Sequence, residues 1–129
     1  MAIRLDHFTV PCRDKEASAK RLADIFGVAW GPASAGPFAA VYISDGLTLD
    51  FDETEEPFPV LHFCFRVTLP EFDAILERIK AADIPYRSKV HGPVDMRIDR
   101  EHGGSIVYWN DPDGHQWEML TVSYARQPG

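Results

Sequence analysis

Two histidines and one glutamate that lie far apart in the sequence have the residue types of a metal site. His7 and His62 are each followed by phenylalanine in an apolar segment, and Glu118 lies between Trp117 and Met119. Two imidazole nitrogens and one carboxylate that meet at one point leave positions open for water or substrate, which suits Zn, Mn, Fe, Co or Ni. A carboxylate between large apolar residues is also costly to bury without a partner. The three residues therefore suggest one divalent metal ion.

The alternation of side chains predicts the direction in which these residues point. The clearest expected strand, 60–67, has one fully apolar face, and His62 lies on the opposite face with other polar residues. If helices cover the apolar face, His62 projects into the space that the sheet encloses. His7 has the same expected direction in the strand 3–10, and Glu118 is expected on the face opposite to its two apolar neighbours.

Asp50 and Tyr108 are two further candidates. Asp50 alternates with apolar neighbours, which favours a fourth metal ligand, although a solvated acid beside the acidic segment 52–59 fits the pattern equally well. A hairpin that pairs symmetrically about residue 113 would place Tyr108 opposite Glu118 on the same face. The phenol would then hydrogen-bond a substrate or the carboxylate, or serve only as an amphipathic lining residue. Tyr108 and Glu118 are the candidate catalytic residues.

Each candidate also has an ordinary structural interpretation. A single histidine in a strand is more often a hydrogen-bonded structural residue than a metal ligand. Glu118 alone would be a strand carboxylate paired with Arg66 or Arg97. The remaining histidines fall in expected loops or turns, where surface positions are the simplest interpretation, and they are His91, His102 and His115. Only the agreement between two halves of the chain favours a metal over these alternatives.

The order strand, helix and then further strands is expected twice along the chain, and we interpret each half as strand, helix and three strands. Histidine followed by phenylalanine stands in the first strand of each half, and an acid follows a turn glycine by four residues in the last strand of each half. The repeat predicts an α+β fold made of two βαβββ modules in tandem. Pro11 is expected to end the first strand, and 31–37 to form a loop. The expected segments are strand 3–10, helix 14–27 and strands 39–43 and 47–51, then strand 60–67, helix 70–83 and strands 86–90, 96–99, 105–109 and 116–122.

A chain of 129 residues fits one domain, so any duplication must lie inside it. We expect a first module at about 1–54, a linker at about 55–59, a second module at about 60–122 and a tail at 123–129.

The composition indicates a soluble globular protein and argues against several classes of partner. The formal net charge is −7 and the 13 basic residues are dispersed, which argues against nucleic acid. No segment has the length and apolar content of a membrane span or the composition of a leader, so we expect a cytoplasmic protein without membrane partners. Cys12 and Cys64 are too few for a disulfide framework. Small molecules or cations are the expected partners.

The sequence resembles the vicinal oxygen chelate superfamily, the group of glyoxalases, bleomycin resistance proteins and extradiol dioxygenases. The resemblance covers Met1 to about Val122 and is most specific at 5–10 and 108–118. It implies that the modules form a curved mixed sheet and that the protein assembles as a homodimer. It also implies a divalent metal ion that binds two oxygens of a substrate as a Lewis acid, with ligands at His7, His62 and Glu118 and a fourth acid at Asp50.

Two classes of function follow from this resemblance. The first is a metal-dependent lyase, isomerase, transferase or dioxygenase that acts on a small oxygenated molecule, because the ligand residues are all present. The second is a sequestering protein, similar to the bleomycin resistance proteins, that binds a cationic drug without catalysis. The net negative charge and the acidic residues of 52–56 motivate this alternative.

Overall fold

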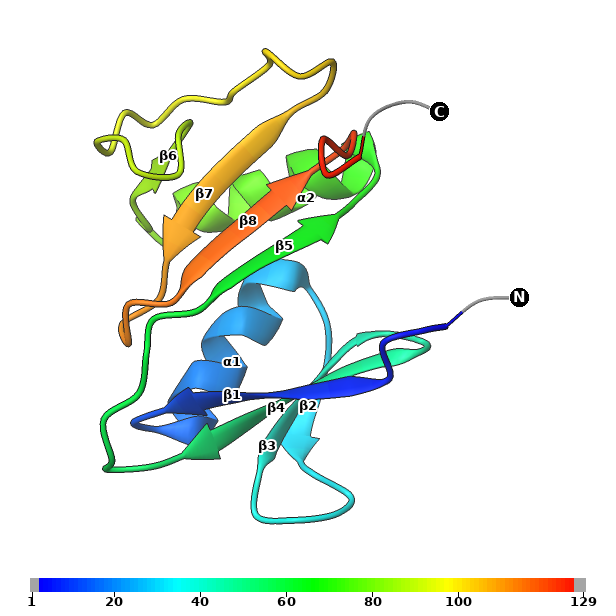
Figure 1. Ribbon diagram of the computed structural model, residues 1–129, viewed down its shortest axis with the longest axis vertical. Coiled ribbons are helices and arrows are strands. Elements are labelled where there is room, and N and C mark those ends of the chain that lie inside the picture. The colour runs from blue at the N-terminus through cyan, green and yellow to red at the C-terminus, as the bar shows by residue number, and fades with distance from the viewer. Residues whose placement is uncertain (1–2, 127–129) are drawn as a thin grey trace. The chain divides into compact units, whose positions relative to one another are not determined.

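The computed structural model describes residues 3–126 and divides into two compact units, Met1–Pro59 and Val60–Gly129. Each unit contains one helix and one four-stranded mixed sheet, which confirms the α+β fold of two tandem modules (Figure 1). The single domain with its linker and tail stays a prediction, and the last three residues of that tail lie outside the described residues. Neither of the two helices among residues 3–126 has the length and apolar content needed to cross a bilayer.

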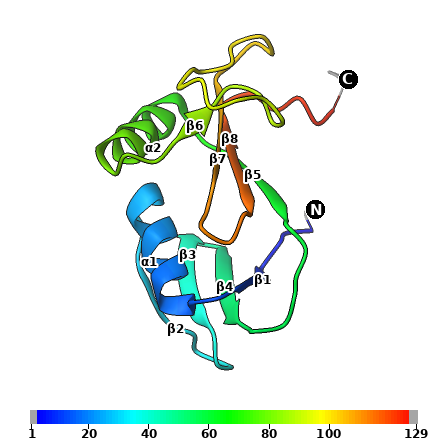
Figure 2. The same cartoon turned by 90° about the vertical axis from the view of Figure 1, so that its left-hand side faces the viewer.

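The first unit places its first and last strands side by side. The sheet order is β1-β4-β3-β2, in which β1 and β4 are parallel and the other pairs are antiparallel. The helix α1 covers one face of this sheet, as two views agree (Figures 1 and 2). The elements are β1 (His7–Cys12), α1 (Lys15–Phe26), β2 (Trp30–Pro32), β3 (Ala39–Ser44) and β4 (Leu47–Glu53).

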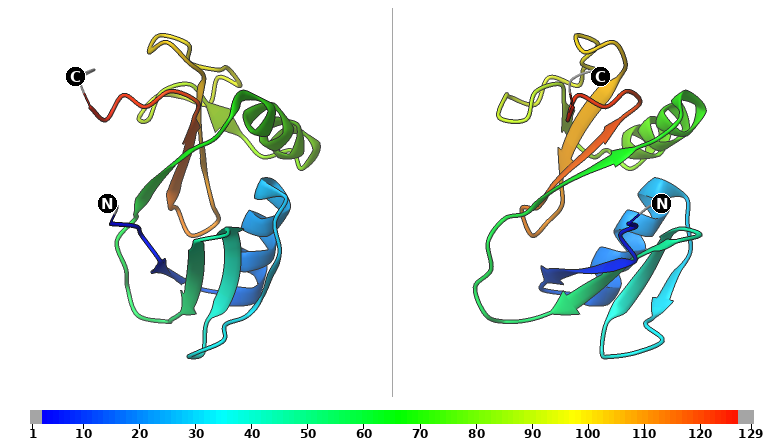
Figure 3. Two further views of the ribbon diagram at one scale, coloured as in Figure 1. Left: turned by 90° about the vertical axis from the view of Figure 1, so that its right-hand side faces the viewer. Right: turned by 45° about the vertical axis from the view of Figure 1, so that its right-hand side comes forward.

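The second unit repeats this arrangement. Its sheet order is β5-β8-β7-β6, with β5 and β8 parallel and with α2 along one face (Figure 3). The strand order therefore corresponds element by element to that of the first unit, which confirms the repeat expected from the sequence. The elements are β5 (His62–Arg66), α2 (Leu69–Ala81), β6 (Tyr86–Arg87), β7 (Ile106–Asn110) and β8 (Gln116–Leu120).

Local signals in the sequence account for the ends of both helices. The Asp14 side chain accepts a hydrogen bond from the Ala17 N–H at 3.1 Å and begins α1, while Gly27 ends it with a left-handed φ of 71°. Thr68 and Glu71 form a capping box at the start of α2. These caps fix where both helices begin and where α1 ends.

The covered faces hold the apolar residues that the period of two predicts. In β1 and β4 the buried positions alternate with the positions of His7 and Asp50, which are at least partly exposed. In β5 the less exposed residues are the phenylalanines, and His62 lies on the exposed face. Large side chains below 2% exposure form the core, and they include Phe51, Leu49, Val41, Val10, Phe72, Ile79, Trp109, Trp117 and Met119.

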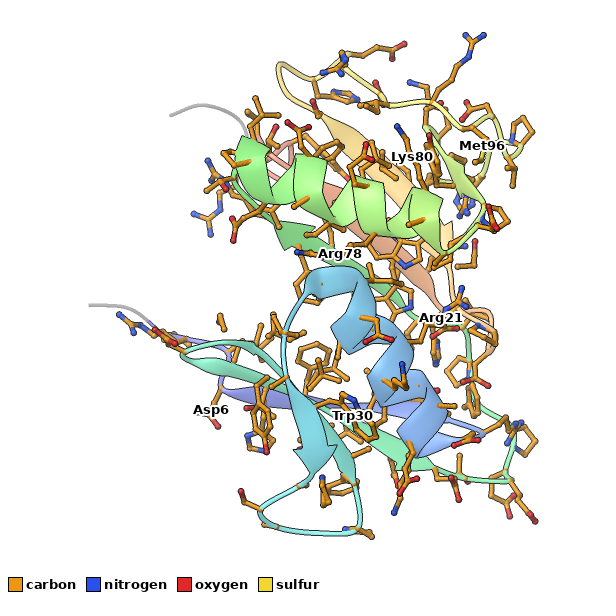
Figure 4. The ribbon with its side chains drawn as sticks, turned by 180° about the vertical axis from the view of Figure 1, so that it is seen from behind. Asp6, Arg21, Trp30, Arg78, Lys80 and Met96 are labelled. Carbon is orange, nitrogen blue, oxygen red and sulfur yellow. The ribbon has the colours of Figure 1, made fainter. Side chains whose placement is uncertain are left out.

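Three expectations about the strands are wrong. Pro11 lies inside β1, because β1 is the outer strand of its sheet and a proline without an N–H is tolerated there. Residues 30–32 form the short strand β2, which overlaps the start of the expected loop 31–37. The expected strand 96–99 is reduced to one bridge between Asp99 and Ile106, and Met96 in this segment has a left-handed φ of 54° (Figure 4).

Candidate functional site

The strongest candidate site lies on the face of the second sheet opposite to α2, where His62 meets Glu118. In the parallel pair of β5 and β8, His62 is opposite Gln116 and Cys64 is opposite Glu118. His62 therefore reaches Glu118 diagonally, and its Nε2 atom lies 2.9 Å from Oε1 of the carboxylate. The His62 side chain is 41% exposed whereas the Glu118 side chain is fully buried. The pair thus joins an accessible imidazole to an inaccessible carboxylate.

Glu118 is buried because its strand is covered on both faces. Trp117 and Met119 point to the helix side of the sheet and are buried there. On the side of Glu118, the apolar residues Ile106 and Leu120 pack with the ring of Tyr108 in one cluster. The carboxylate therefore lies among apolar groups, where an ion without a partner is unfavourable.

Tyr108 lies directly opposite Glu118 in the antiparallel pair of β7 and β8, as the hairpin centred on residue 113 predicts. Burial raises the pKa of the Tyr108 phenol, a hydrogen bond with Tyr124 opposes this, and the charge of Glu118 raises it further. The Arg87 guanidinium lies 5.9 Å from the centre of the Tyr108 ring and bonds the backbone oxygens of 89–90, which holds the ring in place. Tyr108 is therefore a protonated phenol at the carboxylate.

Two more proton-bearing groups reach the same carboxylate. The Tyr124 hydroxyl donates to Oε2 of Glu118 at 2.6 Å. Burial raises the pKa of Tyr124, and the hydrogen bond to Glu118 adds to this effect. The Cys64 thiol loses part of its hydration although the residue is exposed, and this loss together with the Glu118 charge raises its pKa to about 12. Glu118 is thus surrounded by an imidazole, two phenols and a thiol.

The first unit carries a corresponding pair, His7 and Asp50. His7 is opposite Thr48 and Thr9 is opposite Asp50, so the offset between histidine and acid equals that of His62 and Glu118. His7 differs in its contacts, because its Nδ1 atom lies 2.7 Å from Oδ2 of Asp6, the residue labelled just before β1 in Figure 4. The hydrogen bond with Asp6 raises the pKa of His7, and the charges of Asp6 and Asp50 act in the same direction.

A cavity of about 410 Å³ lies beside His7 and Asp50 within the first unit. Small and aromatic side chains form its apolar part, and hydroxyl and carboxylate groups form its polar part. Its lining residues are Asp6, His7, Thr9, Ala33, Ser34, Ala35, Gly36, Phe38, Ala40, Tyr42, Thr48 and Asp50. Its volume and mixed lining are suited to a small organic molecule.

The amino-acid sequence matches no protein-family model and no curated protein. Solved structures do match: "Oxidase ChaP-H1" is 38% identical with a TM-score of 0.87, and the match covers 97% of this chain and 100% of that chain. "Oxidase ChaP-H2" is 36% identical with a TM-score of 0.88, over 97% of this chain and 98% of that chain. The chain belongs to the vicinal oxygen chelate superfamily. A glyoxalase/dioxygenase from Nostoc punctiforme, 22% identical with a TM-score of 0.68 over 93% and 91% of the two chains, shares the fold.

Membership of the vicinal oxygen chelate superfamily gives the two pairs a common interpretation. Each module of this chain contributes one histidine and one acid with the same strand offset. Imidazole nitrogen and carboxylate oxygen are suitable ligands for Zn, Mn, Fe, Co and Ni, so the residues present fit a divalent metal ion. The structure brings His62, Glu118 and Tyr108 together in one unit and His7 and Asp50 together in the other. Their meeting at one ion stays a prediction, as does the homodimer.

Another group of potential ligands lies outside these pairs. Among residues 3–126, Asp99, Glu101 and His102 are close enough together to hold an ion. The Lys89 ammonium already bonds Asp99 at 3.0 Å and Glu101 at 2.8 Å. A lysine in this position supplies the positive charge that a metal would otherwise provide, so we interpret this group as a surface ion-pair network.

Sequence reasoning placed one histidine wrongly and missed one tyrosine. His91 and His102 are exposed as expected, but His115 is fully buried. Its ring Nδ1 atom accepts a hydrogen bond from the Leu61 N–H at 3.0 Å, and the backbone N–H of His115 donates to Asp111 Oδ1 at 2.9 Å. Tyr124, the missed residue, follows the last strand without any periodic signal, so only the three-dimensional path of the chain reveals its contact with Glu118.

Proposed function

We propose that this protein is a metal-dependent enzyme that oxidises a small oxygenated molecule with dioxygen. The ligands of the ion are His7, His62 and Glu118, with Asp50 as a fourth. One observation carries the proposal most directly, namely that the fully buried Glu118 carboxylate has His62 Nε2 at 2.9 Å. The reaction type is supported by two relatives above 30% identity that are both called oxidases.

The electrostatics of Glu118 favour a cation at this site. A buried carboxylate without a compensating charge is unfavourable by several kcal/mol. Its neighbours His62, Tyr108, Tyr124 and Cys64 donate hydrogen bonds or lie close by, but none of them has a permanent positive charge. A divalent ion would supply the missing charge and would exploit the imidazole nitrogen already facing the carboxylate.

The remaining residues bind and orient the substrate. When bound, the metal ion acts as a Lewis acid toward substrate oxygens. The cavity beside His7 receives the organic part of the molecule, with Phe38 and Tyr42 as its aromatic contacts. Tyr108 keeps its proton because its pKa is raised, and it donates a hydrogen bond to a substrate oxygen.

Metal analysis provides the first test. Protein purified without chelator is analysed for metals, and chelator-treated protein is titrated with Mn²⁺, Fe²⁺, Co²⁺, Ni²⁺ and Zn²⁺ while the melting temperature is recorded. We expect about one ion per chain and a rise in melting temperature that His62→Ala, Glu118→Gln and His7→Ala each abolish or strongly reduce. His91→Ala removes an exposed loop histidine outside the proposed ligand set and serves as the matched control. Absence of binding for every ion would contradict the proposal.

Oxygen uptake separates catalysis from sequestration. The metal-loaded protein is mixed with small enediols, catechols and hydroxyquinones in an oxygen electrode, and we expect at least one class to consume dioxygen in a metal-dependent manner. Tight binding of a cationic drug that is unchanged in a His7→Ala, His62→Ala double variant, without oxygen uptake, would instead favour a sequestering protein.

A further inference from the structure

The chain turns back after β8 and returns to the buried carboxylate. The last residue of β8 is Leu120, and the segment beyond it lies at the end of that strand (Figure 1, red). Tyr124 lies in this segment, six residues after Glu118, and its hydroxyl donates to Oε2 of Glu118 at 2.6 Å. The other oxygen, Oε1, faces His62. The two carboxylate oxygens thus have different partners.

The path of this segment is fixed by contacts with the turn before β7. Thr121 and Ser105 form two hydrogen bonds. The Thr121 N–H donates to the Ser105 backbone oxygen at 3.1 Å, and the Ser105 N–H donates to the Thr121 hydroxyl oxygen at 2.9 Å. A Cβ atom on Gly104 would lie 2.6 Å from Thr121 Oγ1 and 2.9 Å from Val122 Cγ2, so only glycine permits this approach. The segment carrying Tyr124 is therefore held by specific backbone contacts.

The ring of Tyr124 is positioned separately from its hydroxyl. Its centre lies 5.5 Å from that of the His102 ring, and the residue is 44% exposed. A phenylalanine at this position keeps the ring contact and the path of the chain. It removes only the hydroxyl, which donates to Glu118 Oε2 and also interacts with the Tyr108 phenol, and thus isolates the contribution of this group.

We propose that Tyr124 is a positioning residue for the ligand Glu118, because its hydroxyl donates to Oε2 and leaves Oε1, the oxygen that faces His62, for a metal ion. This inference rests on the proposed function. A hydrogen bond to one oxygen fixes the rotation of the carboxylate and disfavours ligation through both oxygens. Hydrogen bonds of this kind to a metal ligand change metal affinity by roughly ten to one hundredfold when removed. Tyr124 therefore sets both the affinity and the geometry of the site.

The test uses Co²⁺ alone as the probe and compares Tyr124→Phe with Tyr86→Phe. Tyr86 is a buried phenol of the same unit that pairs with Trp109, outside the carboxylate cluster. Calorimetry should give a Co²⁺ dissociation constant about ten to one hundredfold higher for Tyr124→Phe and an unchanged value for Tyr86→Phe. The visible absorption of bound Co²⁺ should change in band position or intensity only in Tyr124→Phe, since coordination geometry determines these bands. Circular dichroism before each titration establishes that the variants are folded.

A second measurement follows the phenol directly by ultraviolet absorption in the wild type and in a second variant of Tyr124. Binding of Co²⁺ at Glu118 should perturb the ultraviolet absorption of a phenol, and this difference signal should be smaller when Tyr124 is replaced by leucine but not when Tyr86 is replaced by phenylalanine. Wild-type affinity and spectrum in Tyr124→Phe would overturn the role of Tyr124 while leaving the proposed function intact. Failure of the wild-type chain to bind Co²⁺, with Glu118→Gln behaving identically, would overturn both.

Discussion

Glu118 lies two residues beyond the strand partner of His62, and the two side chains meet at 2.9 Å across a parallel pair of strands. The same offset separates His7 from Asp50 in the first unit. In the second unit the acid is buried and touches the imidazole, whereas in the first unit the histidine is bonded to Asp6 instead. The pair His62 and Glu118 and the pair His7 and Asp50 therefore differ in the burial of their charged groups, and this difference leads to measurable predictions.

Glu118→Gln should separate metal binding from stability. In chelator, the variant removes a buried negative charge but keeps an oxygen that accepts from Tyr124, so we expect a free energy of unfolding equal to or about 1 kcal/mol above that of the wild type. With Mn²⁺ the order should reverse, because only the wild type gains stability from the ion. Urea denaturation with and without the ion measures both values. A loss of several kcal/mol in chelator would identify Glu118 as part of a structural ion pair.

The pKa of His7 should fall when Asp6 is replaced by asparagine. The hydrogen bond and charge of Asp6 raise the pKa of His7 above its usual value of 6.5, since both favour the imidazolium form. This interaction stabilises the fold fully below about pH 6.5 and is lost as pH rises through the folded-state pKa. Nuclear magnetic resonance titration of the His7 ring protons in chelator measures the shift. An unchanged titration in Asp6→Asn would show that another group perturbs His7.

The Cys64 thiol should react slowly at neutral pH despite its exposure. Its pKa is raised to about 12 by loss of hydration and by the Glu118 charge, so little thiolate exists at pH 8. We expect the rate of alkylation by iodoacetamide to rise with pH to beyond pH 10, and we expect Glu118→Gln to increase the rate at pH 8. Mass spectrometry of the alkylated peptide distinguishes Cys64 from Cys12, which is buried. Rapid alkylation of the wild type at pH 8 would contradict this prediction.

Gly104→Ala should destabilise the protein, whereas Gly31→Ala should not. The added methyl group at Gly104 would collide with Thr121 and Val122, whereas at Gly31 nothing lies within 4 Å. Overpacking of this kind costs about 1–3 kcal/mol. Urea denaturation of the two variants in parallel measures the difference. Equal stability would mean that the segment after β8 moves aside at little cost.

Patterns that are local in the sequence predicted much of the fold and part of the site. The period of two placed His62 opposite an apolar face, and the turn at 111–114 fixed the register that sets Tyr108 against Glu118. The exposure of His62 and the burial of its neighbouring strand follow from the same alternation. These predictions succeeded because each depends on residues within one strand or one hairpin.

The remaining features depend on contacts between distant residues. The sequence places His115 in a polar turn, yet its ring accepts a hydrogen bond from the backbone N–H of Leu61, 54 positions earlier, and is fully buried. Tyr124 reaches Glu118 only because Gly104 and Ser105 guide the chain after β8. The periodic spacing of apolar residues in the sequence does not predict such tertiary contacts. The pairing of Pro11 within an outer strand likewise depends on the sheet order rather than on the residue itself.

The pairing of first and last strands has a consequence for synthesis on the ribosome. In each sheet the first strand has its partner in the strand made last, β4 for β1 and β8 for β5. The strand β1 can pair with β4 once Glu53 has left the ribosome. The strand β5 can pair with β8 only after residues 116–120 have been synthesised. A nascent chain arrested between these points carries one finished sheet together with one strand whose edge is still open. Such an edge invites chaperone binding and pairing with other nascent chains.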